Sequence, residues 1–194
     1  MAHPFRHFRV LLCMLLAAAL CAACAAEVGE ALPLETYQDP GGRFTLSIPK
    51  GWQAESSPDG SLLTLTPLDY GGTETELRVL LYISPTNTLD TSEHVEEATA
   101  LFQPFLEKYL DDSYEVINQG ETKVDKVPAF LIDYAKPYGQ TYLTGRLVMV
   151  AVPGYALAFL GSAERSGWES FLPTFRALLA DFHLLLIPES TPLP

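Results

Sequence analysis

The side chains best suited to catalysis in this sequence are one serine and lysine pair and two histidines. Ser47 and Lys50 have the spacing of an S-x-x-K motif, in which the lysine takes the proton of a nucleophilic serine. That chemistry needs the serine at the start of a helix, whereas Ser47 lies in an alternating, strand-like segment interrupted by Pro49, where the two side chains point to opposite faces. His94 and His183 have no partner at a metal-binding spacing. We therefore expect no enzymatic activity, no metal site and no cofactor.

Carboxylates are abundant, but they lack the pattern of a dedicated cation site. Glu93, Glu96 and Glu97 lie close together, as do Asp111 and Asp112, without the loop spacing of an EF-hand. A solvated helix face that maintains solubility explains them. Weak binding of a divalent cation is the alternative.

Tyrosines offer a different kind of site. Tyr134, Tyr138 and Tyr142 surround residues 136–140, whose Lys-Pro-Tyr-Gly-Gln sequence is typical of a hairpin tip. Tyrosine combines an apolar ring with a hydroxyl group and suits recognition surfaces. We predict that these three residues bind a partner, with ordinary strand positions as the alternative.

The first 23 residues have the pattern of an export signal. Arg6 and Arg9 form a short basic start, and residues 10–23 form an uncharged Ala/Leu-rich run of 14 residues, which is short for a membrane span. The sequence Leu-Cys-Ala-Ala-Cys that ends at Cys24 resembles the lipobox of bacterial lipoproteins. That resemblance implies a lipoprotein-type signal peptide over residues 1–23 and fatty acyl chains such as palmitate on Cys24, which would anchor the mature protein at the extracytoplasmic face of a membrane.

Two other outcomes fit the same leader. Cleavage after the Ala-x-Ala sequence 23–25 would release a secreted, soluble protein, and an uncleaved leader would form an N-terminal anchor. Cys13, Cys21 and Cys24 are the only cysteines of the chain, so the sequence beyond residue 24 holds no disulfide and no cysteine-based metal site.

The charge of the chain limits its partners. The sequence has 12 Lys and Arg against 24 Asp and Glu, a net charge of -12. Because the leader holds two of the basic residues and no acidic one, the mature chain has 10 against 24, or -14. Such a surface repels nucleic acid and anionic lipid headgroups. Membrane attachment must then come from the acyl chains and not from a basic patch.

The mature chain is organised as a single domain between two short ends. Residues 24–35 are rich in Ala, Glu, Gly and Pro, with few large apolar side chains, and form a tether, and residues 188–194 form a Pro-rich tail. Residues 36–187, about 150 residues, are the usual size of one domain.

Periodicity predicts a mixed fold. Strands are expected at 36–38, 43–48, 61–66, 77–83, 127–134, 147–152 and 155–160. The last four are apolar on both faces, and the short turns between strands require antiparallel neighbours. Apolar residues recur at helical spacing over 90–110 and over 168–182, each containing one interior proline. The prediction is an α+β protein in which helices cover both faces of a largely antiparallel sheet, an α/β/α sandwich.

One stretch of sequence suggests a known fold. Residues 44–52, Phe-Thr-Leu-Ser-Ile-Pro-Lys-Gly-Trp, resemble the opening of PsbP-like domains and of the DcrB-like bacterial lipoproteins that share their fold. The last predicted helix, with Trp168, Phe175 and the sequence up to Asp181 and Phe182, also resembles the final element of that family. The resemblance implies the α/β/α sandwich. PsbP itself is an extrinsic photosystem subunit and DcrB-like proteins are envelope lipoproteins, but these hydrophobic signatures carry no activity.

Together these features predict a non-catalytic binding or assembly accessory domain. It would be lipid-anchored at the extracytoplasmic face of a bacterial membrane, with an envelope protein as its partner. Two alternatives stay open. One is a periplasmic carrier of a small molecule or lipid, which needs an apolar cavity, and the other is a hydrolase whose site is assembled from residues distant in sequence.

Overall fold

A computed structural model describes residues 31–68, 77–85, 95–110, 112–152 and 154–185 of the chain. The predicted signal peptide, Cys24, most of the tether and the Pro-rich tail lie outside these residues. Among the described helices, none has the length and apolar content needed to span a membrane.

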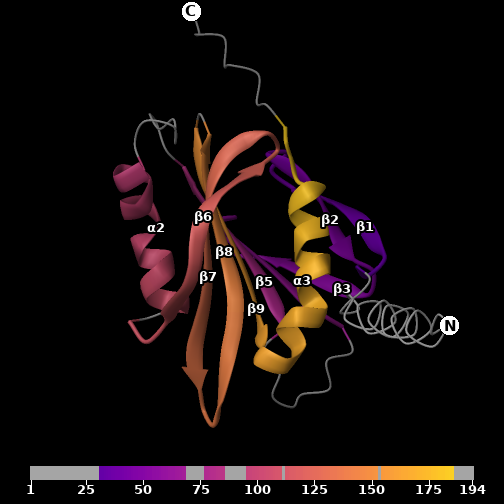
Figure 1. Ribbon diagram of the computed structural model, residues 1–194. Helices are drawn as coiled ribbons and strands as arrows, with labels where there is room; N and C mark the ends of the chain where they lie inside the picture. Colours follow the sequence, from indigo (N-terminus) through magenta and orange to yellow (C-terminus); the bar gives the residue numbers. More distant parts are fainter. Residues whose placement is uncertain (1–30, 69–76, 86–94, 111, 153, 186–194) are drawn as a thin grey trace, which may run out of the picture.

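A seven-stranded antiparallel sheet forms the centre of the domain (Figure 1). Its strands lie in the order β3-β4-β5-β9-β8-β7-β6. Their bounds are β3 Trp52–Ser56, β4 Leu62–Pro67, β5 Arg78–Pro85, β6 Glu115–Val124, β7 Val127–Tyr138, β8 Thr141–Val152 and β9 Tyr155–Glu164. Every neighbouring pair is antiparallel.

The residues of β5 show why this sheet needs cover on both faces. Val79 and Leu81 point to one face and belong to an apolar cluster with Phe175 of helix α3 (Arg165–Ala180). Leu80, between them, points to the other face and belongs to a cluster with Phe102 of helix α2 (Val95–Tyr109). Figure 1 shows the two helices on opposite sides of the sheet. Two separate cores therefore meet at the sheet.

A second, three-stranded sheet lies beside α3. Its order is β1-β2-β10, with β1 at Leu34–Gln38, β2 at Phe44–Pro49 and β10 at His183–Leu184. Phe44, Leu46 and Ile48 of β2 are buried in the same cluster as α3 and β5. This face of the large sheet is thus covered by α3 and by the small sheet together.

The α+β class and the antiparallel sheet agree with the prediction, but cover of both faces by helices alone does not describe the fold. Periodicity shows that β2 has a buried face without showing what buries it, so the separate small sheet was not predicted. The domain also begins earlier than residue 36, because β1 starts at Leu34 and the Leu32 N–H donates to the Thr174 hydroxyl of α3 at 3.0 Å.

The interior prolines do not divide the helices. Pro104 lies within α2 and is exposed, and Pro173 lies within α3 and is half-buried. Glu164 is the N-cap residue of α3 and makes no side-chain cap bond. Strand β9 runs directly into this helix, so no separate capping segment precedes it.

Candidate binding groove

The predicted tyrosine surface is not assembled. Tyr134 is only 2% exposed and packs in the core on the α2 side, whereas Tyr138 and Tyr142 are 38% and 48% exposed. Tyr142 pairs with Pro137 across β7 and β8, and directly paired residues share a face. Tyr142 therefore lies on the opposite face from Tyr138, which shares the face of Tyr134. The register of the hairpin separates the three rings.

The described residues considered for catalysis lie in or directly beside the small sheet. Ser47 lies within β2 and pairs with Thr36 of β1, and Lys50 follows the strand. His183 in β10 has Asp125 beside it, with 3.4 Å between Nδ1 and a carboxylate oxygen. His94 lies outside the described residues. Across the part of the chain that the structure describes, no three His, Cys, Asp or Glu side chains gather as a metal site would require.

The acidic group considered for cation binding cannot be placed. Glu93 and Asp111 lie outside the described residues, and the side chains of Glu96 and Glu97 are not described. Weak binding of a divalent cation therefore stays a prediction.

A rigid turn between β3 and β4 lies beside the best candidate site. The Asp59 carboxylate accepts hydrogen bonds from the Ser57 hydroxyl at 2.6 Å and from the Ser61 backbone N–H at 3.1 Å, and the Ser61 hydroxyl donates to it from a position 2.9 Å from both carboxylate oxygens. These hydrogen bonds, that of Ser57 first, lower the pKa of Asp59 to about 2. Asp59 is exposed and carries its negative charge at every ordinary pH.

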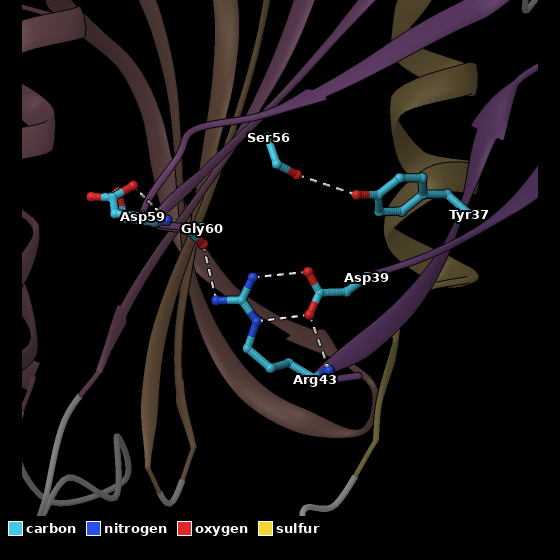
Figure 2. A network of polar contacts seen from close by, with 7 residues as sticks. Tyr37, Asp39, Arg43, Ser56, Asp59 and Gly60 are labelled. Atoms are coloured by element: carbon cyan, nitrogen blue, oxygen red, sulfur yellow. Dashed lines mark hydrogen bonds and ion pairs between the residues drawn. The ribbon is translucent and has the colours of Figure 1, made fainter. Parts of the chain in front are cut away.

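Arg43 fixes this turn to the rest of the domain (Figure 2). Its guanidinium binds both carboxylate oxygens of Asp39 at 2.8 Å and donates to the Gly60 carbonyl at 2.9 Å. The β1–β2 turn and the β3–β4 turn are thereby joined by one side chain. The hydrogen bonds to Arg43 lower the pKa of Asp39, and burial of its carboxyl group opposes that shift only in part.

An open groove of about 530 Å³ lies between this turn, β5 and α2. Tyr82 of β5 stacks on Phe105 of α2 with 5.1 Å between ring centroids, and Phe105 in turn contacts Tyr109 at 4.9 Å. The Lys108 ammonium lies over the Tyr109 ring at 5.0 Å. The groove thus has an aromatic floor, with a cation on the helix side and the Asp59 carboxylate on the turn side.

A second hollow of about 430 Å³ lies on the other side of the β3–β4 turn, between that turn and the β1–β2 turn. Its charged groups Asp39 and Arg43 bind each other, and its described lining residues include no aromatic ring. The aromatic groove is therefore the stronger candidate for a ligand.

Sequence reasoning did not find this groove, although it predicted elements on both sides of it. Tyr82 lies in the strand expected at 77–83, and Phe105, Lys108 and Tyr109 lie in the helix expected over 90–110. These segments are distant in sequence, and only the fold brings them together.

Comparison with known proteins gives the fold of the domain. No protein-family model matches this sequence, and no curated protein matches it either. The solution structure of cyanobacterial PsbP (CyanoP) from Synechocystis is similar with a TM-score of 0.60 and 18% identity, over 83% of this chain and 97% of that one. The crystal structure of LpqN, which is involved in cell envelope biogenesis of Mycobacterium tuberculosis, is similar with a TM-score of 0.58 and 10% identity, over 79% and 91% of the two chains. The chain has the PsbP-like fold that residues 44–52 suggested.

Proposed function

We propose that this chain is an exported, non-catalytic binding domain that serves a protein assembly at the extracytoplasmic face of a bacterial membrane and is held there by a lipid on Cys24. The observation that supports a binding role best is the aromatic groove beside the rigid β3–β4 turn. Open sites with apolar floors and a few placed polar groups are typical of recognition.

A non-catalytic role fits the chemistry of the described residues. The two serines of the groove lining are occupied in fixing the turn, because the hydroxyl groups of Ser57 and Ser61 both donate to Asp59. A serine nucleophile would instead donate to a general base such as histidine, which the groove lining lacks among the described residues. LpqN supports an envelope role by analogy of fold.

A carrier function is less well supported than recognition at the surface. A carrier needs an enclosed apolar space, whereas the α3 side of the sheet is filled by side chains such as Phe159, Phe175 and Phe182, each with no exposed surface. The groove on the α2 side is open to solvent.

Lipid anchoring is tested by substitution of the acceptor cysteine. Cys24→Ala should move the protein from the membrane fraction to the soluble fraction, because the acidic surface gives no other hold on the lipid. Cys13→Ala changes a cysteine outside the lipobox-like sequence; it is the matched control and should leave the protein in the membrane fraction. Unchanged fractionation of Cys24→Ala would remove the anchor from the proposal.

The binding role is tested by mild crosslinking of the tagged chain in its own membrane. We expect one envelope protein to be crosslinked to the wild type and its yield to fall in the released Cys24→Ala variant. A wild type that crosslinks to no specific protein would contradict the binding role.

A further inference from the structure

Two prolines face the groove from opposite walls. Pro58 in the β3–β4 turn and Pro104 in α2 are both exposed, and the half-buried rings of Tyr82 and Tyr109 lie in the lining between them. Flat surfaces made of tyrosine and proline are the kind on which polyproline II segments dock, because the pyrrolidine rings of such a segment pack against aromatic faces.

The polar groups of the groove complement such a segment. A polyproline II chain makes no internal hydrogen bonds, so its carbonyl groups need donors. Lys108 and the hydroxyl groups of Tyr82 and Tyr109 supply donors in the groove lining. The Asp59 carboxylate is held in place by Ser57 and Ser61, and it can form an ion pair with a basic side chain.

We propose that the groove between α2 and the β3–β4 turn binds a short proline-containing segment of the partner protein, in polyproline II conformation, with a Lys or Arg that reaches Asp59. The inference rests on the proposed binding function and names the chemistry of its partner. The net charge of -12 favours a basic segment by long-range attraction. An open groove suits a chain that enters at one end and leaves at the other.

Two other occupants fit less well. A small organic cation would have to displace Lys108 from the Tyr109 ring, which already has a cation over it at 5.0 Å. The Pro-rich end of a second copy of this chain, residues 188–194, contains Glu189 and no basic residue.

Synthetic peptides test the proposal directly. Fluorescein-labelled Ala-Pro-Pro-Arg-Pro-Pro-Ala is titrated with the full chain in detergent, and fluorescence anisotropy reports binding. We expect this peptide to bind about tenfold more tightly than the same peptide with glycine in place of every proline, and about fivefold more tightly than the version with Glu in place of Arg. Equal affinity for the proline and glycine peptides would overturn the proposal.

Substitutions in the chain test whether the peptide binds in this groove. Tyr109→Ala should weaken the Arg peptide about tenfold, whereas Tyr109→Phe should retain the preference for proline because it keeps the ring. Asp59→Asn should remove the difference between the Arg and Glu peptides. Tyr142→Ala removes a tyrosine that lies outside the groove and is 48% exposed, and this variant should bind as the wild type does. Wild-type binding by a folded Tyr109→Ala variant would overturn the assignment of the groove.

Failure of this inference is distinguishable from failure of the proposed function. If anchored Tyr109→Ala still crosslinks to the same envelope protein as the wild type, the partner uses another surface and the groove inference is wrong, while the accessory function stands. If the wild type itself crosslinks to no specific protein, the proposed function fails.

Discussion

Arg43 stabilises the domain at a point where two turns meet. Its partner Asp39 is 3% exposed and receives two side-chain hydrogen bonds and the Arg43 backbone N–H, so the carboxylate is held in its charged form. Gly60 completes the contact through its carbonyl. Loss of one partner would leave a buried charged group of the other without compensation, which is costlier than removing both.

The lowered pKa of Asp39 makes this contribution depend on pH. The ordinary Asp pKa is 3.8, and Arg43 lowers it in the folded state. The ion pair therefore stabilises the protein fully above pH 3.8, and this contribution is lost as the pH falls through the lower folded-state pKa. Asp39→Asn should cost about 1–3 kcal/mol in urea unfolding at pH 7, and the gap to the wild type should close at lower pH.

The control for this prediction is Glu169→Gln, which changes an exposed carboxylate of α3 and should follow the wild type throughout. A gap between Asp39→Asn and the wild type that stays constant down to pH 2 would show that the asparagine disturbs the turn and that loss of the ion pair is not the cause.

Single residues also show which features of the structure could be predicted from the sequence. The strands at 36–38 and 43–48 were predicted, because the pattern of a strand is present in neighbouring residues. The contact of Arg43 with Gly60 was not predicted, because it joins two turns. Tyr134 was assigned to a surface although its strand is apolar on both faces. The structure buries it, since the absent side chain of Gly145 leaves room for its ring.

The close packing of helix α3 on strand β9 depends on Gly161, which has no side chain. A Cβ atom on Gly161 would lie 2.6 Å from the Phe175 ring, closer than real contacts allow. Gly161→Ala should therefore force the helix or the ring to move, and we expect a loss of about 1–3 kcal/mol in urea unfolding.

Gly120 of β6 is the matched control, because a Cβ atom there would meet nothing within 4 Å. Gly120→Ala should leave the free energy of unfolding nearly unchanged. The double variant Gly161→Ala with Phe175→Leu should recover part of the loss relative to Phe175→Leu alone. Equal effects of the two alanine variants would mean that α3 does not pack on β9 as described.

Two of the strands that sequence reasoning missed, β3 and β6, share a physical cause. β6 is an edge strand whose residues 115–119 are all exposed, and β3 is the other edge, with Trp52 as its one fully buried side chain. Edge strands that face solvent on both sides have no apolar period of two, so periodicity cannot detect them. The central strands and both helices were predicted because they bury regular stripes.

In the molecule as a whole, the ring of Phe182 packs against both sheets. Its ring lies 5.4 Å from Phe44 of the small sheet and 4.9 Å from Phe159 of the large sheet. The small sheet therefore shares one core with α3 and the large sheet. We expect one cooperative transition, in which tryptophan fluorescence and far-UV circular dichroism coincide.

Phe182→Ala should shift both signals together by about 3–5 kcal/mol, because it removes a ring from the shared core. Leu185→Ala changes a side chain that is 37% exposed and should have little effect. Separate transitions in the wild type would show that the small sheet unfolds independently.

The point where the chain enters the domain limits how a domain anchored through Cys24 can be oriented relative to the membrane. Leu32 is bound to Thr174, so the chain enters the domain against α3, and this point is only eight positions beyond Cys24. Eight extended residues reach about 28 Å at most, which is less than the length of a typical small domain. A domain tethered through Cys24 would turn α3 toward the bilayer. The groove beside α2, on the opposite side of the sheet, would then face away from the lipid and toward whatever stands in the space beyond.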